Sequence, residues 1–230
     1  MKLRLYYNWV RIICFIFFIL ICFSFAGCSS PKKQIKPRPL AVPVDKVVFV
    51  GIIPALDKAS SAAMIMDPLG GSVFEAEPVP PGANVVLTGL IIEKLNEANR
   101  YSLIIPTPEQ MGDKNFSASF SGYETNVRDF LVKFGKDLKV DAVMVGWLYR
   151  WNDRKGSEFA AQSASSLAFD LHLISTSNGS VLWREKFDKT QQSLSENILD
   201  FGTFIKSRGM WLTIEDLAEI GVSNVLSELP

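Results

Sequence analysis

The chain is poor in the side chains that most often carry catalysis or bind transition metals. It has one histidine, His172, and three cysteines, Cys14, Cys22 and Cys28, among 230 residues. It contains no G-x-S-x-G, G-x-x-x-x-G-K-[ST] or G-x-G-x-x-G sequence, so the common signatures of a nucleophilic serine and of phosphate-binding loops are missing. Its 24 basic residues are balanced by 24 acidic ones. This balance argues against nucleic acid as a partner, because such binding depends on an excess of Lys and Arg.

The single histidine has no evident catalytic partner in the sequence. His172 and Asp170 alternate with apolar residues in a predicted strand and therefore face away from the core. We interpret His172 as a structural or surface residue. A transition-metal site would have to consist almost entirely of carboxylates. Asp45, Asp57 and Asp67 could form a carboxylate cluster, but they do not follow the spacing of any known metal-binding motif. We therefore expect no enzyme, no cofactor, no metal site and no small-molecule substrate.

The N-terminus carries the clearest pattern in the chain. A basic start precedes an uncharged apolar block, Ile12–Phe25, and the small residues Ala26-Gly27 then lead to Cys28 and a polar, proline-rich stretch. The block is shorter than the roughly 20 residues of a membrane-spanning helix and fits the roughly 7–15 residues of a signal-peptide core. The order predicts a secretory signal peptide that ends at a lipid-attachment cysteine. An uncleaved membrane anchor and a soluble secreted product are the alternatives.

Ala26-Gly27-Cys28 resembles the lipobox of bacterial lipoproteins, with Phe25 in the position where leucine is commonest. The resemblance implies cleavage before Cys28, a diacylglycerol on its sulfur and an acyl chain such as palmitate on its amino group. Ser29 implies export to the outer membrane, so we expect the inner leaflet of that membrane, facing the periplasm. No disulfide could then form, because the other two cysteines leave with the signal.

Three segments follow from these features. Residues 1–27 are the predicted lipoprotein signal peptide, 28–43 a tether rich in proline and lysine, and 44–230 a periplasmic α/β domain. The prolines should keep the tether extended. The domain is long enough to bury a sizeable core.

Apolar periodicity predicts the order β-α-β-α-β-β-β-α for this domain. The predicted strands span 46–53, 101–105, 140–151, 163–176 and 181–188, and the predicted helices 83–98, 123–138 and 211–229, with a weaker helical stretch over 193–204. The fold class is therefore α/β (α+β), with a single mixed sheet of about five strands and flanking helices. The last three strands should form an antiparallel meander, in which Asn178-Gly179 marks a hairpin turn.

Two stretches of this domain resemble the periplasmic domain shared by CsgG-type lipoproteins, the LpoB activators and the N-terminal domain of TolB. The matching residues are Val140, Asp141, Ala142, Gly146, Leu171, Leu173, Gly179, Val181, Leu182 and Trp183. The resemblance implies a non-catalytic binding or assembly module of the cell envelope. The alternative is a subunit of a CsgG-like outer-membrane secretion ring. That function would need two membrane-inserting hairpins, and only 140–176 could supply one.

Two regions could contact an envelope protein or a second copy of the chain. The segment 57–82 is too apolar for a passive linker, because it contains Met64, Met66 and Phe74. It could equally fold over the sheet and bury these side chains, and the sequence leaves both possibilities open. Trp147, Tyr149 and Trp151 are spaced by two and should face the same way, with Trp151 the most exposed because a polar turn follows it.

Substitution of Cys28 by serine should block both lipidation and cleavage of the precursor, because the sulfur is the atom that the lipid modifies. Mass spectrometry of the mature N-terminus measures both events. An unmodified first residue other than Cys28, or an intact Met1, in the unsubstituted protein would contradict the assignment.

Overall fold

The computed structural model describes residues 40, 42–111, 127–157, 161–191 and 211–230. The chain divides into two units, 1–36 and 37–230, and the described residues all belong to the second. The signal peptide, Cys28, most of the tether and the weaker helical stretch 193–204 lie outside them. The segment boundaries at 27 and 43 remain predictions.

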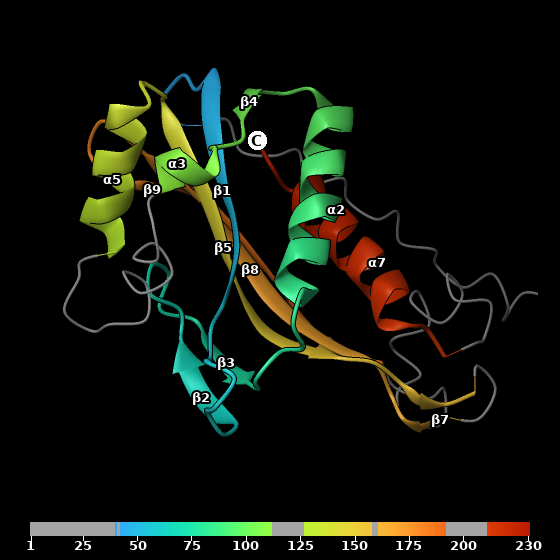
Figure 1. The fold of residues 1–230 in the computed structure, drawn as a ribbon. Coiled ribbons are helices and arrows are strands. Elements are labelled where there is room, and N and C mark those ends of the chain that lie inside the picture. Colours follow the sequence, from blue (N-terminus) through green and yellow to red (C-terminus); the bar gives the residue numbers. More distant parts are fainter. Residues whose placement is uncertain (1–39, 41, 112–126, 158–160, 192–210) are drawn as a thin grey trace, which may run out of the picture. The chain divides into compact units, whose positions relative to one another are not determined.

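A five-stranded mixed sheet forms the centre of the unit 37–230, with the strand order β4-β1-β5-β8-β9 (Figure 1). The strands are β1 Lys46–Pro54, β4 Ser102–Ile104, β5 Ala142–Asn152, β8 Ser166–Ser175 and β9 Val181–Thr190. β4 and β5 run parallel to β1, whereas β5, β8 and β9 form an antiparallel meander. The predicted fold class is confirmed, the five strands of this sheet and the three long helices follow the predicted order, and β5 is the central strand.

The described residues form four helices around this sheet. These are α2 Ala83–Ala98, α3 Pro108–Met111, α5 Val127–Asp137 and α7 Ile214–Ser227. α2 and α7 cover one face of the sheet, and α5 lies on the other (Figure 1). α7 begins in a capping box, in which Thr213 and Asp216 each accept a hydrogen bond from the other's backbone N–H. None of these helices combines the length and the apolar character needed to cross a membrane.

The two faces of the sheet carry two separate apolar cores. On the face covered by α2 and α7, Phe169, Leu171 and Leu173 of β8 pack with Trp183 of β9. On the other face, the core contains Val143 and Val145 of β5 together with residues of α5. Both faces of β5 and β8 are therefore buried, which explains why these strands are apolar over most of their length.

A β-bulge in β5 separates the three aromatic residues that were expected to share a face. Leu148 pairs with Phe169 and Arg150 pairs with Ala168, so Tyr149 is an extra residue on β5. Trp147 and Tyr149 lie in the core on the α5 side, but Trp151 has turned to the core under α2 and α7. Trp151 is the most exposed of the three, as expected, but it is only 6% exposed, so the prediction that it is available as a surface contact was wrong.

The segment 57–82 contains a second, two-stranded sheet that sequence periodicity did not reveal. β2 Ala63–Met66 and β3 Val73–Ala76 pair antiparallel and form a hairpin on the α5 side of the main sheet (Figure 1). Each strand has four residues, too few for a clear period. We refer to residues 63–76 as the cover hairpin.

The cover hairpin is packed on one side and exposed on the other. Phe74 is 1% exposed and stacks on Tyr149, with 3.9 Å between the ring centroids. Met64, Met66 and Val73 are 67%, 65% and 50% exposed. The inner side of the hairpin covers the sheet, as one of the two possibilities predicted, and the outer side exposes the apolar side chains that the interface prediction requires. Phe74, expected as an interface residue, is a core residue instead, because it points at the sheet.

Replacement of Trp183 by alanine should lower the free energy of unfolding by about 3–5 kcal/mol, as other large-to-small core substitutions do. Trp183 is 9% exposed in the core under α7, and its ring nitrogen has no hydrogen-bond partner within the described structure. The loss should therefore come from packing, and Trp183→Phe should lose less. Chemical denaturation of the unit 37–230 tests this, and a loss below about 1 kcal/mol would contradict it.

Candidate functional site

Three buried titratable side chains meet between the cover hairpin and the main sheet. Asp67 comes from the turn of the hairpin, and Asp170 and His172 come from one face of β8. They are 3%, 2% and 1% exposed. One carboxylate oxygen from each aspartate and one ring nitrogen of His172 all lie within 4.8 Å of one another. We call these residues the Asp–His cluster.

The cluster corrects one half of the prediction for His172, which was a structural or a surface residue. The alternation along β8 was read correctly, because Asp170 and His172 do point away from the core under α2 and α7. The face on which they lie, however, is covered by the hairpin, so His172 is buried and not at the surface. Of the three aspartates considered as a cluster, only Asp67 takes part, whereas Asp45 and Asp57 are exposed. No sequence signal linked Asp67 to β8, because more than 100 residues separate them.

The hairpin turn holds Asp67 in a defined position. Its backbone N–H donates to the carbonyl of Ser72 at 2.7 Å, and its Oδ1 accepts the N–H of Leu69 at 2.8 Å. This is an Asx turn, a local structure that the aspartate side chain favours. Gly71 adopts a φ of 72°, a conformation that favours glycine. The sequence Asp-Pro-Leu-Gly-Gly-Ser thus directs a carboxylate toward β8.

Asp170 is held independently of its neighbours in the cluster. Its Oδ1 accepts the backbone N–H of Trp147 at 3.0 Å, and its Oδ2 accepts the hydroxyl of Tyr149 at 2.8 Å. Both donors come from β5, just before and at the bulge. The bulge therefore places a tyrosine hydroxyl where it orients the buried carboxylate.

His172 lies between the two carboxylates without a hydrogen bond to either. Its Nε2 is 3.3 Å from Oδ1 of Asp67 and 3.2 Å from Oδ2 of Asp170. These contacts lack hydrogen-bond geometry, and neither ring nitrogen has a hydrogen-bond partner among the described residues. The Trp147 ring stands edge-on to the imidazole, with 5.7 Å between centroids.

The electrostatics of the cluster favour a positive charge at its centre. Burial alone lowers the pKa of His172, but Asp170 and Asp67 outweigh burial and raise that pKa to about 9. Burial raises the pKa of Asp67, yet the contact with His172 and the N–H groups of its turn bring it below the usual value. Burial raises the pKa of Asp170 and of Tyr149 above their usual ranges. The two carboxylates therefore face the positive charge of a protonated His172 in an almost fully buried cluster.

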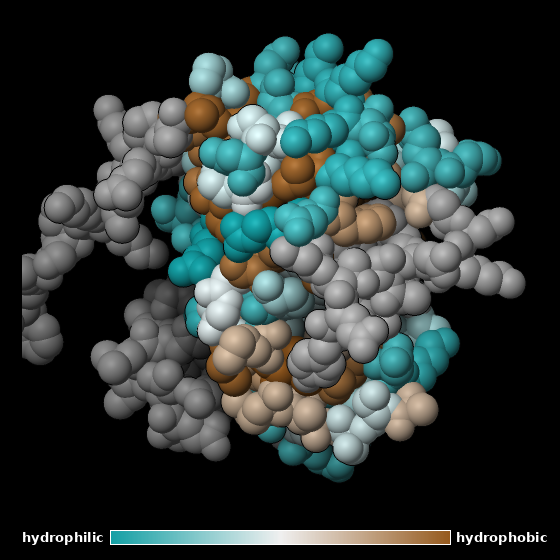
Figure 2. Space-filling view, turned by 90° about the vertical axis from the view of Figure 1, so that its left-hand side faces the viewer, coloured by the Kyte–Doolittle hydropathy of each residue, from teal (hydrophilic) through white to brown (hydrophobic). Residues whose placement is uncertain are grey.

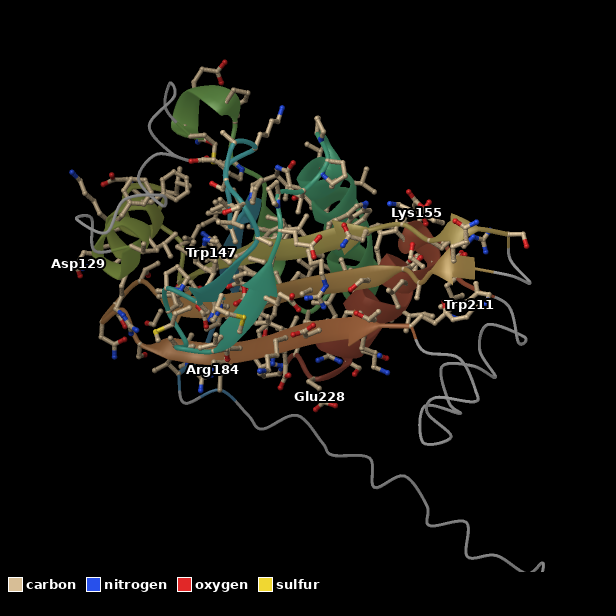
Figure 3. The ribbon with its side chains drawn as sticks, turned by 90° about the horizontal axis from the view of Figure 1, so that it is seen from below. Asp129, Trp147, Lys155, Arg184, Trp211 and Glu228 are labelled. Carbon is tan, nitrogen blue, oxygen red and sulfur yellow. The ribbon has the colours of Figure 1, made fainter. Side chains whose placement is uncertain are left out.

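Polar contacts also hold the hairpin against the main sheet. Figure 3 shows this part of the molecule from below, with Trp147 and Arg184 labelled. Arg184 of β9 donates to the carbonyl of Gly70 at 2.6 Å, and Arg150 of β5 donates to the carbonyl of Glu75 at 3.0 Å. Glu77 directly follows the hairpin, and its backbone N–H donates to the carbonyl of Tyr149 at 2.7 Å. These three hydrogen bonds hold the inner side of the hairpin against the sheet, and none of them involves its outer side.

Comparison with known proteins gives similarity in solved structures only. No family model and no curated protein matches the chain. The PelC dodecamer from Paraburkholderia phytofirmans is 15% identical, with a TM-score of 0.48 over 84% of this chain and 93% of that chain. Lipoprotein GNA1162 from Neisseria meningitidis is 12% identical, with a TM-score of 0.39 over 71% of this chain and 94% of that chain.

The LpoB C-terminal domain from Salmonella enterica is 13% identical, with a TM-score of 0.30 over 66% of this chain and 87% of that chain. LpoB is also one of the proteins named in the resemblance predicted from the sequence. All three TM-scores are below 0.5, so no function is carried over from these proteins to the chain. The likeness to CsgG-type lipoproteins stays a prediction.

Substitution of Gly70 by alanine should lower the free energy of unfolding by about 1–3 kcal/mol, as overpacking does. A Cβ at this position would lie 2.3 Å from Oδ2 of Asp67, 2.8 Å from Nη1 of Arg184 and 3.2 Å from Cε1 of His172. Gly89→Ala is the matched control, because a Cβ there meets nothing within 4 Å and helix α2 should gain up to about 1 kcal/mol. Equal effects of the two substitutions in chemical denaturation would contradict the packing described for the cluster.

Proposed function

We propose that the chain is a lipid-anchored, non-catalytic binding module of the cell envelope, held by Cys28 in the inner leaflet of the outer membrane. In this proposal it contacts another envelope protein through the outer side of the cover hairpin. The observation that supports the contact is the exposure of Met64, Met66 and Val73, at 67%, 65% and 50%, on a hairpin whose other side is packed.

The three side chains form one apolar surface, which we call the methionine surface. Met64 and Met66 alternate along β2 and so share a side, and Met66 is the cross-strand partner of Val73. In Figure 2, tan and brown residues gather in the lower part of the view, where the hairpin faces the reader. Grouped apolar residues at a surface favour a protein contact, and methionine adapts to irregular partners.

The unpaired edge of β2 favours a partner that binds as an extended segment. Within the described residues β2 pairs on one side only, with β3, and its sequence Ala-Met-Ile-Met has neither charge nor proline. Charge and proline are the usual means by which proteins protect an edge strand from pairing. We therefore propose that the partner supplies an extended segment, which pairs along β2 and packs on Met64 and Met66.

The secretion-ring alternative has less support. It requires β5 and β8 to present residues to lipid, whereas every residue of β8 and all but the last of β5 are buried. These strands pack against the helices and the cover hairpin instead. We therefore propose the binding module as the function.

The double substitution Met64→Ser with Met66→Ser should abolish the partner contact and change the free energy of unfolding by less than about 0.5 kcal/mol, as surface substitutions usually do. Ile105→Ser is the matched control, because Ile105 is a 47% exposed apolar residue after β4, at the end of the sheet away from the hairpin (Figure 1). Photo-crosslinking in living cells measures the contact, with the crosslinker at Val73.

A crosslinked adduct of one defined mass that the double substitution removes, and that Ile105→Ser leaves unchanged, is the expected result. An adduct at twice the mass of the chain would favour self-association over a different envelope protein. Adducts that survive the double substitution, or no adduct at all, would contradict the methionine surface as an interface.

A further inference from the structure

His172 is a buried polar side chain that points into a pair of carboxylates without a hydrogen bond. It is 1% exposed, and its Nε2 has both Asp67 and Asp170 as close neighbours. A buried polar group without a hydrogen bond destabilises the fold, and most buried polar groups in proteins do have a hydrogen-bond partner. One explanation for this exception is that the partner of the nitrogen is an ion at the centre of the cluster.

The two nitrogen–oxygen distances within the cluster suit coordination to a common ion. Tetrahedral zinc has bonds to nitrogen and oxygen of roughly 2.0–2.1 Å, which separates neighbouring ligand atoms by about 3.3–3.4 Å. Nε2 of His172 lies 3.3 Å and 3.2 Å from the two carboxylate oxygens. The separation is at the long end for an N–H···O hydrogen bond.

The donor set selects the class of ion. One imidazole nitrogen with two carboxylate oxygens is a combination that Zn²⁺ and similar transition metals accept, with solvent supplying a further ligand. Ca²⁺ and Mg²⁺ prefer oxygen ligands alone and in larger number. Two carboxylates and a neutral imidazole also balance the charge of a divalent cation.

The surroundings of the carboxylates resemble an outer coordination shell. Tyr149 and the backbone N–H of Trp147 orient Asp170, and the N–H of Leu69 orients Asp67. Hydrogen bonds of this kind hold metal ligands in place and raise affinity. Each carboxylate oxygen retains a second lone pair for an ion.

We propose that Asp67, Asp170 and His172 bind a divalent transition-metal ion, with Zn²⁺ as the representative, beneath the cover hairpin. When the ion binds to Nε2, the proton on that nitrogen is released to solvent. The ion joins the turn of the hairpin to β8. This inference is independent of the proposed function, because it requires no partner protein.

The single histidine of the chain allows a direct test in the unsubstituted protein. The full-length chain is purified in detergent without a polyhistidine tag and labelled with ¹⁵N-histidine. Nitrogen NMR then reports one imidazole, that of His172. Titration with Zn²⁺ should saturate at one ion per chain and shift the Nε2 resonance to the position of a metal-bound nitrogen.

Substitutions then assign the other two ligands. Asp67→Asn and Asp170→Asn should each weaken Zn²⁺ binding by at least about 10-fold in calorimetry, since even outer-shell changes have that effect. Asp129→Asn is the matched control, because Asp129 is an exposed carboxylate on α5 (Figure 3) and should leave the affinity unchanged. Circular dichroism checks that each variant is folded.

Two results would overturn the site. One is the absence of saturable Zn²⁺ binding to the folded full-length chain. The other is Zn²⁺ binding that leaves the Nε2 resonance of His172 unchanged, which would place the ion elsewhere. The NMR titration decides the question even if every variant of the cluster fails to fold, because it uses the unsubstituted protein.

Discussion

The rest of the structure depends on the burial of one face of the main sheet, the face on the α5 side. β8 carries apolar residues on one face and Ala168, Asp170 and His172 on the other, and α5 and the cover hairpin make that second face an interior. Polar groups in an interior must find partners within the protein, because water is excluded. Asp67 is brought to this face by the turn of the hairpin, so its carboxylate and that of Asp170 share one imidazole.

The bulge in β5 follows from the same requirement. Because Tyr149 is an extra residue in β5, two successive side chains, Tyr149 and Arg150, lie on the hairpin side of the sheet. Tyr149 stacks on Phe74 and donates to Asp170, and Arg150 donates to the carbonyl of Glu75. Trp151 can then return to the opposite core. One irregularity in one strand thus supplies an apolar contact, a buried hydrogen bond and a contact to the hairpin backbone.

Sequence reasoning predicted the elements with a strong period and missed what depends on distant contacts. The main strands and the long helices have clear apolar patterns, and Trp183 was placed on the buried face correctly. The turn after β8 was also found at Asn178-Gly179, although only Gly179 has a positive φ. The hairpin was missed because its strands are short. The bulge was missed because residues two apart share a face only in a regular strand, and the sequence gives no sign that β5 is irregular. The Asp–His cluster was missed because its members come together only through the hairpin.

Hydrogen–deuterium exchange of the full-length chain tests most directly whether the hairpin is a fixed part of the interior, because slow exchange requires stable burial and hydrogen bonding. The amides of Asp67 and Glu77, which donate to Ser72 and Tyr149, should exchange slowly in the unsubstituted protein. Asp67→Asn should speed their exchange and leave that of β1 unchanged. Rapid exchange of both amides in the unsubstituted protein would contradict a hairpin that seals the second face of the sheet.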